Sequence, residues 1–184
     1  MELNEGILIH CARHGDIDAF EQLVARYTPK LYRVVQRMAA NTSQAEDITQ
    51  EAFLRVWQTL SRFQEDADFF PYLAKIATNL LYDEWRRSKR YVFNQLENID
   101  ETMSVTTPTP EQVAENAERR KILVQAVCAL PPAYRTVIAL RYDAEMSYQQ
   151  IAETLDIPLN TVRTHLHRAK AYLQKFLEER LNDG

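Results

Sequence analysis

The sequence has little glycine, 3 of 184 residues, against the roughly 7% that is usual in proteins. This scarcity disfavours turn-rich β sandwiches and the glycine loops that cradle nucleotide phosphates. The two cysteines, Cys11 and Cys128, form no CxxC pair, which argues against a disulfide framework or a zinc ribbon. No apolar run is long enough for a membrane span, and the first residues lack the basic-then-apolar order of a secretion signal. We therefore expect a cytoplasmic protein without a membrane span.

Apolar residue types make up 46% of the chain, which is enough for a packed core. They recur at spacings of three and four along most of its length, and no alternation typical of a strand is long enough to indicate a sheet. The sequence therefore predicts an all-α protein. In the first half we expect a helix capped by Asp16, a second opening at Thr28-Pro29, a third opened by a capping box from Ser43 to Glu46 and running to about Leu60, and a fourth from Asp68.

The helical spacing fails from about Val92 to Pro110, where threonine and proline dominate. We therefore predict two small helical domains, residues 1–92 and 111–184, joined by a flexible linker over 93–110.

The net charge of −4 hides an uneven distribution. Residues 67–92 carry a net charge of +2 and residues 119–184 a net charge of +3, whereas residues 93–118 hold six carboxylates and no basic side chain. The acidic stretch is typical of a solvated linker, and it is also suited to repelling or mimicking nucleic acid.

A helix-turn-helix is predicted near the C-terminus. A capping box from Ser147 to Gln150 opens a short helix, Asp156-Ile157-Pro158 interrupts it, and a longer helix follows without an acidic residue before Glu178. In this motif the second helix enters the major groove of DNA, where arginine pairs well with guanine. The expected reading face consists of Arg163, Thr164, His167 and Arg168, with Lys170 beside it. The alternative is a solvated face of a helical hairpin.

The helix from Gln44 to Leu60 has two faces. Ile48, Ala52 and Val56 recur every four residues and are typical of a core. The other face gathers carboxylates and aromatic rings, and exposed aromatic side chains often anchor protein interfaces. We expect a protein-docking surface made of Asp47, Gln50, Glu51, Phe53 and Trp57. The alternative is a helix face without a partner.

Together these segments resemble a bacterial sigma factor of the extracytoplasmic-function (ECF) class. Residues 45–57 are similar to the family motif that docks on RNA polymerase, residues 69–87 to the segment that melts and reads the −10 element, and residues 130–135 with the helix-turn-helix to the domain that reads the −35 element. The similarity runs in order from about Asp18 to Leu177.

The resemblance implies two globular domains, sigma regions two and four, that bind core RNA polymerase and direct it to promoter DNA. It implies that the docking surface above contacts the β′ clamp helices and that the C-terminal domain touches the β flap. It assigns −10 recognition to Asn79, Asp83, Arg86, Arg87, Lys89 and Arg90, and −35 recognition to the helix-turn-helix residues already named. Members of the class are usually controlled by an anti-sigma factor, which adds a candidate partner.

The sequence also departs from the family pattern. Phe70 stands where a basic residue is usual and Tyr72 where tryptophan is usual. In the helix-turn-helix, Asp156 and Asn160 replace glycines that are common in the family, and Pro158 replaces a serine-like cap. We expect these changes to leave the architecture intact, but because of them the base preferences of the family are not carried over to this chain.

Other functions have less support. No nucleophile–base pair is evident, so we expect neither an enzyme nor a cofactor. His10, Cys11 and His14 share a helical face but lack a fourth metal ligand nearby. The principal alternative is a regulator that binds DNA by itself through the helix-turn-helix and uses the N-terminal domain as a sensor. Such a sensor has no need of the docking surface between Asp47 and Trp57.

Overall fold

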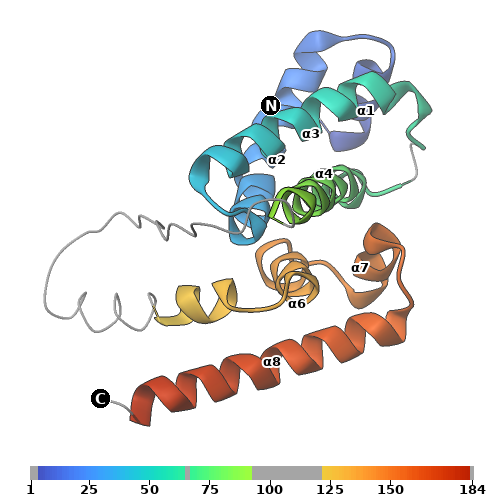
Figure 1. Ribbon diagram of the computed structural model, residues 1–184. Helices are drawn as coiled ribbons and strands as arrows, with labels where there is room; N and C mark the ends of the chain where they lie inside the picture. The colour runs from blue at the N-terminus through green and yellow to red at the C-terminus, as the bar shows by residue number, and fades with distance from the viewer. Residues whose placement is uncertain (1–3, 65–66, 93–121, 183–184) are drawn as a thin grey trace, which may run out of the picture.

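The structure is a computed structural model that describes residues 4–64, 67–92 and 122–182, with side chains described as far as Arg87 and Glu179 in the two longest helices. All regular structure within these ranges is helical (Figure 1). This confirms the predicted all-α class. The predicted linker, residues 93–110, lies outside the described residues.

Four helices form the N-terminal group, and each packs against the next in chain order. Their bounds are α1 Glu5–Arg13, α2 Ile17–Met38, α3 Thr42–Thr59 and α4 Phe69–Val92, with a short 3-10 turn, η1, at Leu60–Arg62. The cap predicted for α2 is present, because the Asp16 carboxylate accepts a hydrogen bond of 3.0 Å from the Ala19 amide.

The helix start predicted at Thr28-Pro29 is wrong, because α2 continues through Pro29. The Thr28 hydroxyl donates backwards to the Val24 carbonyl at 2.7 Å and caps nothing. Leu23 and Leu31, on either side of the proline, are both fully buried. Proline inside a helix costs about 3 kcal/mol, and burial of one apolar stripe along all of α2 outweighs that cost.

The start of α3 also differs from the prediction. Asn41, rather than Ser43, caps the helix, and its side chain accepts a hydrogen bond of 2.8 Å from the Gln44 amide. The Gln44 side chain accepts in turn from the Ala40 amide. Asparagine is as good a cap as serine, and here it begins the helix two residues earlier than Ser43 would.

The C-terminal group begins with a helical segment at residues 122–128. It continues with α6 Pro132–Ile138, a π-helical turn, η2, at Ala139–Asp143, α7 Tyr148–Leu155 and α8 Leu159–Asn182. The half-buried guanidinium of Arg135 donates to the carbonyls of Cys128 and Leu130 and so fixes the turn before α6. Burial lowers the pKa of Arg135 from its usual value.

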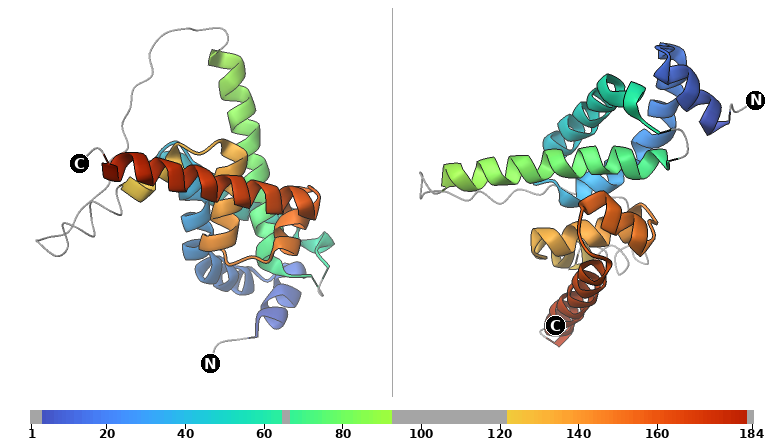
Figure 2. Two further views of the ribbon diagram at one scale, coloured as in Figure 1. Left: turned by 90° about the horizontal axis from the view of Figure 1, so that it is seen from below. Right: turned by 90° about the vertical axis from the view of Figure 1, so that its right-hand side faces the viewer.

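The two groups pack against each other through α2 and α4 on one side and η2, α6 and α7 on the other. In Figure 1, α6 and α7 lie between α4 and α8, and α8 forms the outer edge. Figure 2 shows the C-terminal end of α4 projecting beyond the other helices. In the part of the chain that the structure describes, no helix is long and apolar enough to cross a membrane.

Candidate functional site

The helix-turn-helix forms as predicted from α7, a tight turn and α8. The Ser147 hydroxyl accepts from the Gln150 amide at 3.1 Å, and the Gln150 side chain accepts from the Ser147 amide at 2.9 Å, so the capping box is complete. Asp156 ends α7 in the left-handed conformation, with φ 52° and ψ 45°. Glycine adopts this conformation freely and aspartate tolerates it, so the departure at Asp156 preserves the turn.

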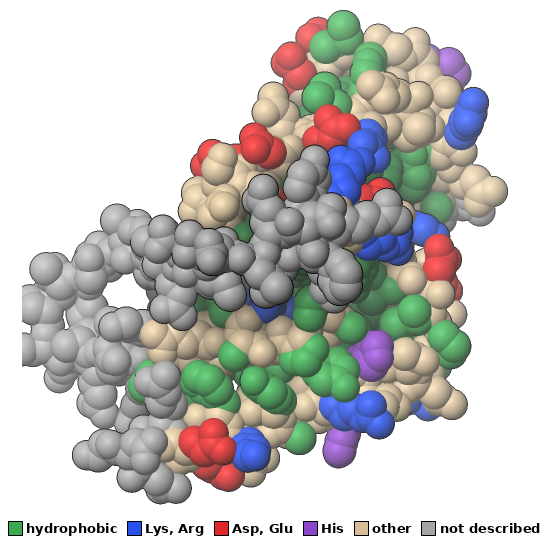
Figure 3. All heavy atoms as spheres, viewed as in Figure 1, with side chains coloured by type: hydrophobic (Ala, Val, Ile, Leu, Met, Phe, Trp, Pro, Cys, Tyr) green, Lys and Arg blue, Asp and Glu red, His purple; other side chains and the backbone are tan. Residues whose placement is uncertain are grey.

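The two sides of α8 differ sharply. Val162, Leu166 and Ala169 are buried and form part of the core with Ile151 of α7. The five residues expected to contact DNA are all exposed: Arg163, Thr164, His167, Arg168 and Lys170. Figure 3 shows basic and histidine side chains gathered over the N-terminal half of α8. The structure therefore presents the predicted reading face to solvent.

A cluster of tyrosines and cations extends this face, and the sequence interpretation missed it. The Lys170 ammonium lies 5.9 Å from the Tyr142 ring centre, and the Arg141 guanidinium lies 5.6 Å from the Tyr148 ring centre. A hydrogen bond to Tyr142 raises the pKa of Lys170. Regular helical spacing from buried Ile138 would turn Tyr142 inward, but the wider π turn rotates it outward, where it is 54% exposed.

His165 lies beside the reading face and is turned inward. Its ring lies 5.3 Å from the ring of Tyr134, centre to centre, and its buried Nδ1 has no hydrogen-bond partner. Partial burial lowers the pKa of His165, and the nearby charge of Arg168 lowers it further.

The docking face of α3 differs from the prediction in its aromatic residues. Asp47 and Gln50 are exposed and Glu51 is half-buried, as a contact surface requires. Phe53, however, is only 6% exposed and belongs to the core, and the half-buried ring of Trp57 lies 4.9 Å from that of Phe20. The expectation of two exposed aromatic residues is therefore wrong.

Leu54 takes the place expected for the aromatic residues on this face. It is 52% exposed and lies one helical turn from Gln50 and two from Asp47. Beside it, Arg55 donates to the Glu51 carboxylate at 2.8 Å. The face is thus an exposed leucine surrounded by polar and charged groups. Counting residues at i+3, i+4 and i+7 from Asp47 would have found Leu54.

The residues expected to contact the −10 element lie along α4. Asn79, Asp83, Arg86 and Arg87 are exposed, and Arg86 donates to the Asp83 carboxylate at 3.2 Å. The opposite side of the helix is core, with Leu73, Ala77 and Leu81 buried. Lys89 and Arg90 continue the helix, but their side chains lie outside the described residues.

Two departures from the family pattern belong to the core of this group. Tyr72 lies 2.5 Å, hydroxyl to hydroxyl, from Thr59, and its ring packs against Phe63. Phe70 is buried, and the Lys30 ammonium of α2 lies 4.3 Å from its ring centre. Lys30 therefore places a cation beside a position where the family usually has a basic residue.

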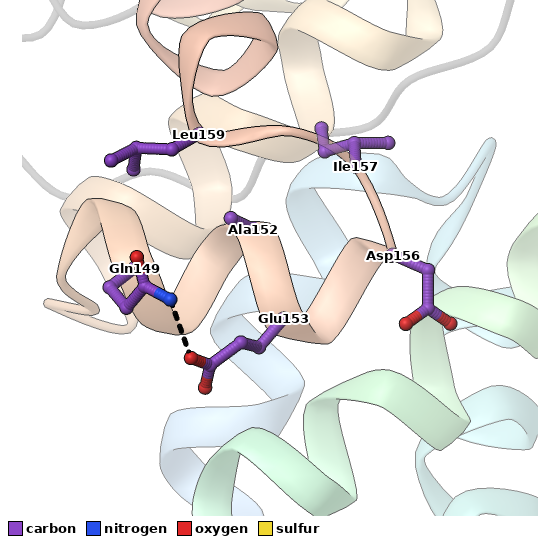
Figure 4. A pocket seen from close by; sticks show the side chains of 6 residues that line it. All are labelled: Gln149, Ala152, Glu153, Asp156, Ile157 and Leu159. Carbon is purple, nitrogen blue, oxygen red and sulfur yellow. Dashed lines mark hydrogen bonds between the residues drawn. The ribbon is translucent and has the colours of Figure 1, made fainter.

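A shallow pocket lies on the first helix and turn of the helix-turn-helix (Figure 4). Its volume is about 320 Å³, and it is lined by Gln149, Ala152, Glu153, Asp156, Ile157 and Leu159. The Gln149 side chain donates to Glu153 at 2.7 Å. Two carboxylates in the lining disfavour a phosphate ligand, so the pocket does not belong to the reading face.

The histidines of α1 do not form a metal centre in this conformation. Nδ1 of His14 lies 2.8 Å from the carbonyl oxygen of His10. Among the residues with described positions, no three histidine, cysteine or carboxylate side chains are grouped so as to hold a metal ion.

Comparison with known families matches both halves of the chain. Residues 23–91 match Sigma-70 region 2, and residues 120–173 match Sigma-70, region 4. The chain is 36% identical over 175 residues to the ECF RNA polymerase sigma factor SigW of Bacillus subtilis, covering 91% of this chain and 93% of that protein. It is 31% identical over 176 residues to the ECF RNA polymerase sigma-E factor of Escherichia coli K12, covering 92% of each.

Solved structures share the fold. The sigma factor RpoE of Bartonella quintana, in complex with the anti-sigma factor NepR, superposes with a TM-score of 0.75 at 20% identity, covering 86% of this chain and 96% of that one. CnrH, in complex with the cytosolic domain of CnrY, gives 0.69 at 24% identity, covering 95% and 97%.

Proposed function

The chain belongs to the ECF RNA polymerase sigma factors, and we propose that three of its surfaces divide the work of promoter-directed initiation. The exposed face of α3 binds core polymerase, the exposed side of α4 holds the −10 element, and the helix-turn-helix reads the −35 element. Region two extends over residues 1–92 and region four over 111–184 in this proposal. The protein acts in the cytoplasm, is not itself an enzyme and needs no cofactor.

The α3 face is suited to the β′ clamp helices. A half-exposed apolar residue surrounded by polar groups is the arrangement of an interface centre with a hydrated rim. Here Leu54 is the apolar centre, and Asp47, Gln50 and Glu51 supply the polar groups. Phe53 and Trp57 support this face from below instead of contacting the polymerase directly.

The α4 side is suited to single-stranded DNA. An asparagine side chain carries both donors and acceptors, so Asn79 can pair with the edge of a base flipped out of the −10 strand. Arg86 and Arg87 are exposed two turns further along α4, where they meet backbone phosphates. Asp83 holds Arg86 in place through their ion pair.

The helix-turn-helix combines base reading with phosphate contacts. Arg163 lies in the first turns of α8, where side chains reach base edges, and a bidentate pair with guanine suits it. Lys170 lies two turns further on, beside the hydroxyl of Tyr142. The Lys170 ammonium and the Tyr142 hydroxyl together offer one charged and one neutral donor to a phosphate oxygen.

Two further partners follow from the family. We propose that the C-terminal group also touches the β flap of the polymerase. An anti-sigma factor is a further candidate partner, since the RpoE structure that shares this fold contains the anti-sigma factor NepR. The CnrH structure, which also shares the fold, contains the cytosolic domain of CnrY.

The observation that carries the proposal is that a docking face and two separate DNA-contact surfaces, all exposed, occur on one chain. We expect Glu51→Lys to weaken binding to core polymerase at least tenfold, because a broken central contact typically costs about 2 kcal/mol. Glu21→Lys makes the same charge change at an exposed position of α2, so it is the matched control and should leave the affinity unchanged. Equal affinity of the two variants for core would remove α3 from the interface. Sequence-specific promoter binding by the chain alone would instead favour the stand-alone regulator.

A further inference from the structure

We propose that the free protein is held closed by an interdomain latch, consisting of the ion pairs Arg37–Asp143 and Lys75–Asp156, and that core polymerase binds the open form. In both pairs the N-terminal group supplies the cation and the C-terminal group the carboxylate. The two pairs therefore pull the groups together rather than stabilising either group by itself.

Arg37–Asp143 is the stronger pair. Both Nε and an Nη of Arg37 donate to the two carboxylate oxygens of Asp143, and the Asp143 side chain is only 12% exposed. Bidentate, charge-assisted and partly buried pairs are the strong kind. The hydrogen bond to Asp143 raises the pKa of Arg37, although partial burial opposes the shift. The π turn η2 ends at Asp143 and places it against the last turn of α2.

Lys75–Asp156 joins α4 to the turn of the helix-turn-helix. The lysine ammonium lies 2.8 Å from the carboxylate, and Asp156 is 75% exposed. Such a pair is weak and is screened by salt. Immediately before α4, Asp68 accepts a hydrogen bond of 2.7 Å from Gln150, the residue that also completes the capping box of α7. The exposed part of the latch therefore fixes α7 against the start of α4.

Neutral contacts lie beneath the latch. The Tyr82 hydroxyl donates to the Thr136 hydroxyl at 3.2 Å, and Thr136 is fully buried. The apolar core is continuous from one group to the other. Apolar burial by itself is insensitive to charge, so the ion pairs supply the part of the interface that salt and charge changes can release.

The closed arrangement has a consequence for promoter binding, which rests on the proposed function. The −10 and −35 surfaces belong to different groups, so a rigid closed form holds them at a single separation. In the closed form Asp68 and Lys75, which lie beside the proposed −10 surface, bond to the C-terminal group. The turn that precedes the reading helix is held in the same way, through Asp156. A partner that binds only the open form has an apparent affinity equal to its intrinsic affinity multiplied by the fraction of molecules that are open.

The experiment uses the full-length chain with Asp143→Asn and Asp156→Asn combined. Asparagine keeps the shape of aspartate and tolerates the left-handed conformation at 156, so both groups should stay folded. Glu153→Gln removes an exposed carboxylate of α7 that accepts a hydrogen bond from Gln149 of the same helix, and it serves as the control. Paired dyes on cysteines introduced at exposed Ile17 and Tyr172, with Cys11 and Cys128 replaced by alanine, report the distance between the groups.

We expect energy transfer to fall in the double variant at low salt, and to fall in the parent and in Glu153→Gln only when salt is raised. Affinity for core polymerase should tighten about three- to tenfold in the double variant alone. Unchanged transfer in a folded double variant would overturn the latch. Lower transfer with unchanged core affinity would overturn its link to polymerase. A chain that binds no core at all would refute the proposed function, whereas the dye distances would still decide the latch.

Discussion

On the exposed side of α8, the surroundings of each side chain indicate what it contacts. Arg163 and Lys170 share one exposed stripe but have different surroundings. Arg163 is near the start of the helix and donates to the Asn160 side chain at 3.4 Å, whereas Lys170 has its charge beside a tyrosine ring. The position of Arg163 suits a base edge, and that of Lys170 suits a phosphate.

The first prediction separates these roles. Arg163→Ala should cost about 1–3 kcal/mol at the preferred −35 sequence and relax the preference at one base position. Lys170→Ala should weaken binding to all sequences alike and lower the slope of log affinity against log salt by about one unit. Holoenzyme binding to a promoter library at several salt concentrations measures both effects. A uniform loss for Arg163→Ala, with no position relaxed, would make it another phosphate contact.

The second prediction concerns His165 and pH. Because its pKa is lower in the folded protein than in the unfolded chain, the unfolded chain binds more protons as the pH falls. The stability that His165 contributes is therefore complete above its unfolded pKa of about 6.5 and is lost as the pH falls through that value toward the folded one. Thermal melting should show a smaller loss of stability between neutral and mildly acidic pH in His165→Phe than in the parent. Identical pH profiles would show that His165 titrates alike in both states.

At the scale of whole elements, α3 shows that a helix face is defined by packing rather than by residue type. Leu54 and Phe53 are adjacent and both apolar, yet one is half-exposed and the other buried. The burial of Phe53 beside Ala52 and Val56 widens the core stripe, so the phenylalanine ring supports the helix while the leucine faces outward.

The third prediction follows from this difference. Phe53→Ala should lower the free energy of unfolding by about 3–5 kcal/mol, because it leaves a cavity in the core. Leu54→Ala should leave the melting temperature almost unchanged but weaken binding to core polymerase. Thermal melting and core-binding titrations of the two variants give the comparison. A Leu54→Ala protein with parental core affinity would place the interface elsewhere.

The elements also show what local sequence signals can predict. The capping box at Ser147, the turn at Asp156 and the exposed face of α8 were all predicted, because each depends on residues within one or two turns. The continuation of α2 through Pro29 was not, since it depends on burial against other helices. The exposure of Tyr142 was missed for a related reason: a π turn shifts the helical register, and no spacing rule anticipates it.

At the scale of the whole molecule, the sequence predicted two helical groups and their separate roles but not the contacts between them. Arg37 and Asp143 are 106 positions apart, and nothing in either local sequence pairs them. The acidic stretch at 93–118 suggested that the free chain binds DNA poorly by charge repulsion. The interdomain latch adds a geometric reason for the same behaviour, since it keeps the two reading surfaces from separating.

The central claim is that this chain directs core polymerase to promoters through two DNA elements read at once. Run-off transcription from a library of randomised promoters, with and without core enzyme, tests it most directly. We expect transcripts only when core enzyme and the chain are both present, from templates that share a −35 and a −10 sequence at one fixed spacing. Arg163→Ala should relax the first of these sequences alone, and Asn79→Ala the second alone. Transcription by core enzyme that is unchanged by the chain, or starts that share only one element, would contradict the account.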